Sequence, residues 1–461
     1  MIVLGIGTVA GLTDAEQAAL NKLQETFNEH GAKNDEKDRY YEGKISLSEV
    51  NLGIALPDGM RRLEIGCSWG AKTVDVLAAR SMFDGFVGSN GEDIEDLHKV
   101  CVDNRLIAEY AKACRDELEF GCTFVTVSPD EEIGCKIRFH SPRSAAALWD
   151  GEKGRIGCGL AVINTALDND DVNYIPTLVN MYTDDYTLVF SLGESGWNLT
   201  RYPNKMGRPL MEALIWNATS SKPFGRSRIK EPIRRLIQGY VRTVANATIG
   251  LEFATSPQKY LLGVTDEQYD ALINNKFKQY VGSILASTTN PETGEKPSFG
   301  QLTQGNIQPH VEMLRALATQ FSAATGLSST DTGVISVANP TSADALIAQT
   351  QTLIGMAEDL NVSNGDSLRV VAMMALAIIQ DKSLNELSED QKDIVAHFKN
   401  PSMPSVASTA DAALKIASVR GEFSQTDTFL EMIGFSQADI RRIKGEEAKI
   451  RGSQVIGEIE A

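Results

Sequence analysis

The stretch FGRSRIKEPIRRLIQGYVRTV (Phe224–Val244) marks the point where the character of the chain changes. After Gly225, apolar side chains recur every three or four residues, at Ile233, Leu236, Ile237, Tyr240, Val241 and Val244. That spacing is typical of an amphipathic helix. Because a helix tolerates proline only in its first turn, Pro232 predicts a helix that begins near Glu231.

The same stretch is basic in an acidic protein. Six bases, Arg226, Arg228, Lys230, Arg234, Arg235 and Arg242, face one acid, whereas the whole chain has 44 Lys+Arg, 61 Asp+Glu and a net charge of -17. Domains that read DNA combine a basic face with a basic domain, and here the charge is local. We therefore favour an interface or solvated face over a nucleic-acid site, with Arg234, Arg235 and Arg242 on the polar side of the helix.

A second amphipathic helix is predicted after an insert that reads as mixed α/β. Asn306 is a suitable N-cap, and Gly326 is a suitable end. The insert contains a strand, a short helix capped by Thr265 and a hairpin that turns at Asn290–Glu295. Two helices that could pair antiparallel thus flank a compact insert.

The segments on either side of this unit differ from each other. Before it, a capping box at Thr13 and Glu16 opens a helix, and short period-two strands follow from Cys122 onward, so residues 1–224 are predicted to be α+β. After Gly326, a polar loop precedes a helix capped at Thr341 or Ser342, which Asn364-Gly365 is expected to break. Phe398–Ser408 reads as a linker, and helices follow it, the last one capped by Ser436 and Asp439.

Composition narrows the class of protein. The longest apolar run, Val370–Ile379, is shorter than the roughly 18 residues of a membrane span, and the N-terminus has no basic region typical of a secretory signal. All six cysteines lie between Cys67 and Cys158 and form no C-x-x-C pair. We interpret them as reduced thiols, with a disulfide or zinc framework as the alternative.

No local motif indicates an enzyme. Gly5–Gly11 lacks the spacing of a dinucleotide-binding loop, Gly193–Trp197 lacks that of a nucleophile elbow, and Asp168–Asn173 lacks the glycine of a calcium loop. The five histidines are scattered, and there is no phosphate-binding loop. We expect no catalytic residue, no cofactor and no metal ligand.

The order of these parts resembles the portal proteins of tailed bacteriophages, of the siphophage type. The similarity spans about Leu20 to Ile443. It lies in YYEGK (Tyr40–Lys44), in the basic stretch, in SPQKYLLG (Ser256–Gly263), in NPTSADALIAQTQTLIGMAEDL (Asn339–Leu360) and in the linker at Phe398. The resemblance implies a portal fold with wing, antiparallel two-helix stem, α/β clip and helical crown. The wing would comprise residues 1–224 and 341–382, the stem helices residues 225–250 and 306–325, the clip residues 251–305, the tunnel loop residues 326–340, and the linker and crown residues 383–461.

The resemblance also implies function and partners. Such a protein forms a twelve-fold ring at one capsid vertex and lets double-stranded DNA pass, without sequence specificity, during packaging and ejection. Implied protein partners are other copies of itself, the major capsid protein, the terminase large subunit and a head-completion adaptor. The ring would assemble in the host cytoplasm and reside in the virion, with no membrane partner. The three arginines would then contact a neighbouring subunit or the capsid.

The polar loop is the predicted lining of the tunnel. Its first half holds Ser328, Ser329, Thr330, Asp331 and Thr332, which include no base. Such side chains bind phosphate transiently but do not neutralise it, as a sliding channel requires. An ordinary surface loop is the alternative here. For the whole protein, the alternatives are a nucleic-acid processing enzyme with a non-local active site and another ring component of the head–tail connection.

Overall fold

The computed structural model describes residues 2–45, 65–88, 94–167, 174–194, 196–255, 259–262, 294, 298–301, 306–328, 331–333, 343–402, 406–419, 421–435 and 437–459. The chain divides into a larger unit (Met1–Gly43, Ser68–Arg234, Ala323–Ala461) and a smaller unit (Lys44–Cys67, Arg235–Ser322). Helices and strands are both abundant, so the predicted α+β class is confirmed.

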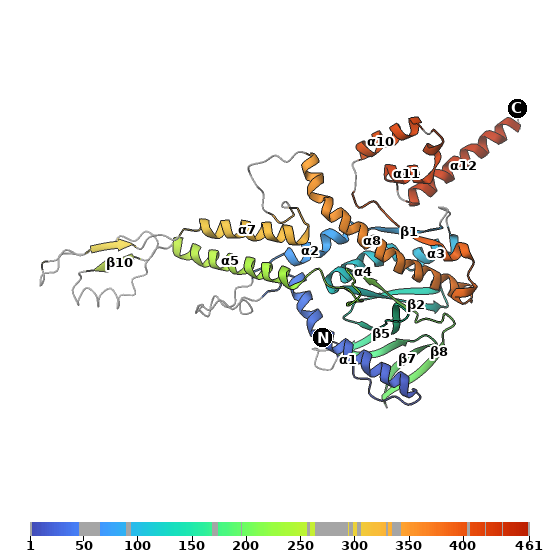
Figure 1. Ribbon diagram of the computed structural model, residues 1–461, viewed down its shortest axis with the longest axis horizontal. Helices are drawn as coiled ribbons and strands as arrows, with labels where there is room; N and C mark the ends of the chain where they lie inside the picture. The colour runs from blue at the N-terminus through green and yellow to red at the C-terminus, as the bar shows by residue number, and fades with distance from the viewer. Residues whose placement is uncertain are drawn as a thin grey trace. The chain divides into compact units, whose positions relative to one another are not determined.

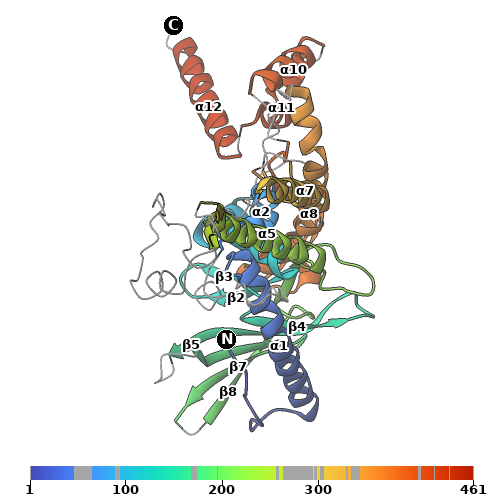
Figure 2. The ribbon, with the colours of Figure 1, turned by 90° about the vertical axis from the view of Figure 1, so that its left-hand side faces the viewer.

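One layer of the larger unit is a five-stranded antiparallel sheet packed against helix α1 (Asp14–Tyr41) (Figures 1 and 2). Its strands, in spatial order, are β4 (Ala145–Asp150), β5 (Arg155–Leu167), β6 (Tyr174–Tyr182), β7 (Tyr186–Gly193) and β8 (Gly196–Pro203). The predicted capping box of Thr13 and Glu16 is present at the start of α1. Leu20, Leu23 and Phe27 then pack into the apolar face of the sheet.

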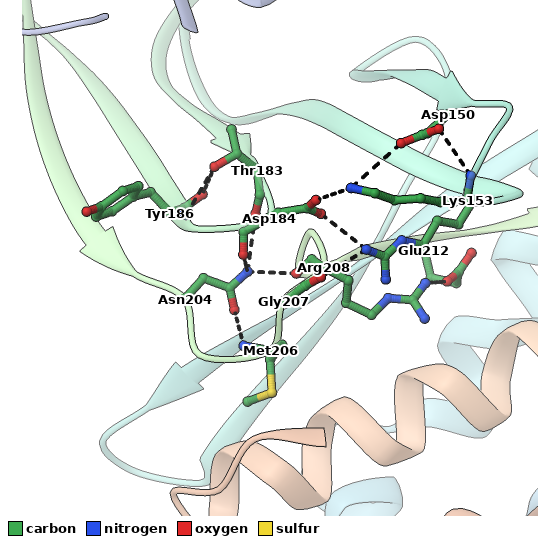
Figure 3. Close-up of polar contacts among 11 residues, drawn as sticks. Asp150, Lys153, Thr183, Asp184, Tyr186, Asn204, Met206, Gly207, Arg208 and Glu212 are labelled. Carbon is green, nitrogen blue, oxygen red and sulfur yellow. Dashed lines mark hydrogen bonds and ion pairs between the residues drawn. The ribbon is translucent and has the colours of Figure 1, made fainter. Parts of the chain in front are cut away.

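Polar contacts tie the turns of this sheet to the next strand, β9 (Met211–Ile215) (Figure 3). Asp184 accepts from Lys153 Nζ at 2.6 Å, and the Asn204 amide donates to the main-chain oxygens of Thr183, Asp184 and Arg208 at 2.7–3.2 Å. Arg208 is paired with the buried carboxylate of Glu212. One amide thus closes two turns at once, which fixes the path from β8 to β9.

The second layer is a three-stranded antiparallel sheet covered by helices. Its strands, in spatial order, are β3 (Gly134–His140), β2 (Cys122–Asp130) and β9. The helices of the larger unit that pack near it are α2 (Trp69–Ala78), α3 (Glu95–Asp103), α4 (Leu106–Phe120) and α8 (Ala343–Ile379). Arg105, at φ +50°, separates α3 from α4, so the sequence between Glu95 and Phe120 forms a helix pair.

Helix α8 passes through Asn364-Gly365 without a break, so the predicted interruption is wrong. Asn364 is fully buried, and its amide donates to Tyr110 Oη at 2.9 Å and to Glu117 Oε2 at 2.7 Å. Tyr110 Oη lies 2.7 Å from Ser81 Oγ, which completes a buried polar network with α4. These tertiary hydrogen bonds offset the low helix propensity of Asn and Gly.

A small sheet was missed by sequence reasoning. Strand β1 (Phe83–Gly88) pairs antiparallel with β12 (Ile394–Phe398), and the rings of Phe83 and Phe398 lie 5.7 Å apart. The linker that was predicted to begin at Phe398 therefore begins after a strand. A 3-10 turn (Leu384–Glu386) and the short α9 (Glu389–Lys392) connect α8 to it.

Within α8, Thr350–Ile379 is long and apolar enough to cross a membrane. One such helix is weak evidence, because the core helix of a globular domain passes the same test. Leu368, Val371 and Met374 are fully buried in the larger unit, as a core helix requires.

In the smaller unit, helices α5 (Glu231–Thr255) and α7 (Gln308–Thr325) run side by side in opposite directions (Figure 1). Both helices lie where the sequence predicted them. A Cβ at Gly239 would lie 3.2 Å from Leu317, so glycine permits the close approach. The insert carries an antiparallel pair, β10 (Lys259–Leu262) and β11 (Ser298–Gln301). The predicted helix at Thr265 and, apart from Gly294, the hairpin turn lie outside the described residues.

The C-terminal part is helical as predicted, with α10 (Val406–Val419), a 3-10 turn (Gly421–Gln425), α11 (Asp427–Ile433) and α12 (Gln437–Ile459). Of the two residues predicted to cap α12, Ser436 lies outside the described residues. All six cysteines are free thiols, and five of them are buried.

Candidate functional site

The basic stretch begins as a strap across the ends of β9 and α4. Gly225 has φ +67°, and a Cβ there would lie 2.1 Å from the Trp216 main-chain oxygen. The main-chain nitrogens of Arg226 and Arg228 donate to the oxygens of Trp216 (3.0 Å) and Leu118 (2.8 Å). Only glycine fits this approach, so Gly225 allows the chain to lie against β9 and α4 just before α5 begins.

Arg228 is the buried centre of this site. Its side chain donates from Nε to the Thr73 oxygen in α2 at 2.7 Å and from Nη2 to the Thr325 oxygen at the end of α7 at 2.8 Å. Nη1 lies 3.4 Å from the sulfur of Met356 in α8, and the guanidinium stacks 5.6 Å from the Trp216 ring. One side chain therefore joins α2, α8 and the last residue of α7, all through residues of the larger unit.

The charge of Arg228 has no carboxylate partner among the described residues. Burial lowers the pKa of its guanidinium to about 10, so the group stays protonated near neutral pH. The cost of burying this charge is offset by main-chain oxygens, one of them at the negative end of the α7 dipole. The geometry is that of a structural clamp.

Arg234 is bound within its own chain. Its guanidinium contacts Glu36 of α1 and Glu231 (2.8 Å), and it stacks 5.9 Å from the Tyr40 ring. Its side chain is 19% exposed, which leaves little of it for another molecule. The predicted interface role of Arg234 remains a prediction, and the structure adds an intramolecular role.

The other two predicted interface arginines lie in the smaller unit. Arg235 is exposed and lies 3.4 Å from Gln238 Oε1. Arg242 is exposed and makes no ion pair within the described residues. Neither contact pattern prevents binding to a second molecule.

Bases between Lys222 and Lys230 also line a cavity of about 410 Å³ beside α1. Lys222, Arg226 and Lys230 are exposed at its rim. Lys37 lies deeper, where it donates to the Phe120 oxygen at 2.9 Å and where burial lowers its pKa. The cavity has the chemistry to accept an acidic group.

The predicted tunnel loop is described only at its base. Ser328 Oγ donates to Asp331 Oδ2 at 2.6 Å, and the Asp331 nitrogen bonds back to Ser328 Oγ at 3.2 Å. Lys72 of α2 contacts the Asp331 oxygen, and Ser328 and Thr332 are buried. Ser329, Thr330 and residues 334–340 lie outside the described residues.

Sequence reasoning found six bases in one short stretch and assigned Arg234, Arg235 and Arg242 to the polar face of the helix. It missed that the six bases have separate roles. Arg228 is buried, Arg234 is paired to α1, and Arg242 is exposed. The only available signal was the position of Arg228 before the helix, outside its polar face. Within the described residues, no group of three or more His, Cys, Asp or Glu side chains could hold a metal ion.

Comparison with known proteins identifies the family. The family model "Phage portal protein, SPP1 Gp6-like" matches residues 20–452. The chain therefore belongs to the SPP1 Gp6-like family of phage portal proteins, which are structural proteins of the head–tail connection. No curated protein matches the chain.

Solved structures with a distant likeness are phage-like particle necks. A chain in "Neck of empty GTA particle computed with C6 symmetry" is 10% identical, with a TM-score of 0.44, and the match covers 84% of this chain and 96% of that chain. A chain in "Neck of native GTA particle computed with C12 symmetry" is 11% identical, with a TM-score of 0.43, and the match covers 80% and 89%.

Proposed function

We propose that this protein assembles into a ring at one vertex of a phage capsid and that double-stranded DNA passes through the centre of the ring during packaging and ejection. The observation that carries the proposal is the family match over residues 20–452. The paired helices α5 and α7, with an insert between them, agree with a stem that carries a clip.

The charge of the chain suits a conduit. A basic tunnel would release counterions on each phosphate contact and would hold DNA tightly. A net charge of -17 per copy and a loop with no base in its first half favour weak, non-specific contact. Within the basic stretch, Arg228 and Arg234 make contacts that stabilise the fold, and Arg242 is exposed and available to a protein partner.

The proposal assigns parts to the chain. Residues 1–224 and 341–382 form the wing, to which the β1–β12 pairing adds Ile394–Phe398. The stem comprises residues 225–250 and 306–325, and the clip comprises residues 251–305. Residues 326–340 form the tunnel loop, and the helices after Phe398 form the crown. The terminase large subunit and later the head-completion adaptor dock on the clip, and the major capsid protein surrounds the wing.

Electron microscopy of the purified full-length protein tests the function. We expect rings with a central hole wide enough for duplex DNA, and incorporation of the protein at one vertex of each head. A compact monomer with DNA or ATP turnover that a point substitution abolishes would overturn the proposal in favour of an enzyme.

A further inference from the structure

A second cavity, of about 470 Å³, lies on the other flank of α1 in the larger unit. Its polar lining is mostly acidic, with Asp35 and Asp38 from α1 and Asp116 and Glu119 from α4. Among the described residues that line the cavity, Arg143, which precedes β4, is the one basic side chain. The cavity therefore gathers more negative than positive groups.

Arg143 is already paired with two of these acids. It lies 3.2 Å from Asp35 and 3.1 Å from Asp38. Asp116 and Glu119 make no ion pair and no side-chain hydrogen bond within the described part of the chain. Two acids of the cavity thus have neither an ion-pair nor a hydrogen-bond partner among the described residues.

Glu119 is the stronger indication of a missing group. It is 4% exposed, and its Oε1 is buried with no hydrogen-bond partner in the described part of the chain, as is Oγ of Ser141 in the same cavity. Buried polar atoms without partners are rare and costly. A donor that entered the cavity would satisfy both atoms.

The chemistry of the lining favours an organic cation over a metal ion. No cluster of described carboxylates is close enough to hold a metal ion. The apolar part of the lining includes Ile2, Phe27, Phe120 and Tyr174. Such a surface suits the methylene stem of lysine or arginine, whose charged end would reach the acids.

We propose that this acidic cavity is a subunit-contact site that takes the ammonium or guanidinium end of a basic side chain from a second copy of the chain. This inference rests on the proposed ring. Copies that each carry -17 repel one another, so a ring needs local pairs of opposite charge. Lys222, Arg226 and Lys230 are exposed, and none of them makes an ion pair within the described residues.

The site couples subunit contact to a proton. Burial, and then the charges of Asp38 and Asp116, raise the pKa of Glu119 to about 8, with Arg143 opposing and Glu42 adding to the rise. Burial also raises the pKa of Asp116 to about 6. A bound cation favours the ionised carboxyl groups, so contact should tighten as pH rises from about 6 to about 8.

The test compares ring assembly of three full-length proteins by mass photometry across protein concentration. They are wild type, the double variant Asp116→Asn with Glu119→Gln, and a matched control, Glu131→Gln with Glu132→Gln, on the exposed β2–β3 turn. We expect the double variant to need about tenfold more protein for half-assembly, equivalent to about 1.4 kcal/mol for each subunit contact, and the control to assemble as wild type. For wild type, the protein concentration at half-assembly should be lower at pH 8 than at pH 6. For the double variant, this concentration should change less between the two pH values.

Thermal unfolding of the unassembled proteins separates loss of contact from loss of fold. The double variant should melt at or above the wild-type temperature, because the buried Glu119 and the half-buried Asp116 are replaced by neutral side chains. Rings of the double variant that form at the wild-type concentration and with the wild-type pH dependence would overturn the inference. So would binding of spermidine to wild type, but not to the double variant, together with unchanged assembly, since the cavity would then serve a free polyamine. If wild type itself forms no ring, the proposed function fails first.

Discussion

Arg228 donates a hydrogen bond of 2.8 Å to the main-chain oxygen of Thr325, and so joins the start of one long helix to the end of the other. The same guanidinium holds the Thr73 oxygen at 2.7 Å. Residues 97 positions apart are thus fixed to each other by a buried cation that uses main-chain oxygens in place of a carboxylate. The base of α5 and the base of α7 therefore behave as one structural element.

Replacement of Arg228 should destabilise the protein strongly. Arg228→Lys keeps the charge but cannot bond both oxygens, and Arg228→Ala leaves both oxygens and a cavity. We expect the free energy of unfolding to fall by about 2–4 kcal/mol for either variant, measured by urea denaturation of unassembled protein. Arg242→Ala is the exposed control and should change it by less than about 0.5 kcal/mol. If the Arg228 variants were as stable as Arg242→Ala, Arg228 would not be a structural clamp.

Glu117 should make stability depend on pH. Burial raises its pKa to about 8, while the unfolded carboxyl titrates near its ordinary value, so the folded state binds the extra proton. The stabilisation that comes from this extra proton is present in full at pH values below the pKa of the unfolded carboxyl group. It is lost as pH rises toward about 8. Wild type should therefore lose stability relative to Glu117→Gln between about pH 5 and 8, by a few kcal/mol at most. Denaturation midpoints that run parallel across that range would disprove the assignment.

Lysines placed at Ser329 and Thr330 test the tunnel loop. In a ring, the added charges should neutralise phosphates and slow DNA movement, more at low salt than at high salt. The measurement is the packaging or ejection rate as a function of salt concentration. Wild-type rates at every salt concentration would show that this loop does not line the constriction.

The charges of the three predicted interface arginines should be reversed one at a time, because the three side chains have different surroundings in the structure. Arg242→Glu, and to a similar extent Arg235→Glu, should impair ring formation or entry into heads without loss of monomer stability. Arg234→Glu should in addition lower the melting temperature, since it breaks contacts with Glu36 and Tyr40. Normal assembly and normal head incorporation by all three variants would remove these residues from the interface.

Much of the fold follows from periodicity. The capping box at Thr13, the strands from Cys122 and the α5 stripe at Ile233, Ile237 and Val241 were all predicted, because local pattern and tertiary burial agree there. The break at Asn364 was wrong because an amide with two buried partners stabilises the helix, and no local rule contains those partners. The strand Ile394–Phe398 was missed for the same reason, since its partner lies more than three hundred residues earlier.

The site was less predictable than the fold. Composition located the basic stretch, and periodicity assigned Arg235 and Arg242 to the exposed side of α5. Its position before the helix separates Arg228 from the arginines of α5, but Arg226 and Lys230 share that position and are exposed, whereas Arg228 is buried among three helices. Likewise, Glu119 reads as one more acid on an amphipathic helix until the fold places it beside Asp38 and Ser141. Both depend on distant chain segments that meet only in three dimensions.

The buried thiols have a practical consequence for experiments on the assembled particle. Burial raises the pKa of Cys158, which is partly accessible, to about 11, and that of Cys122 and Cys135 to about 12, so few thiolates exist at neutral pH. A cysteine introduced at an exposed position should therefore react with maleimide dyes well before the native ones. Fluorophores could then be attached at chosen points of the native sequence, and distances between copies could be followed in single rings as DNA moves through them.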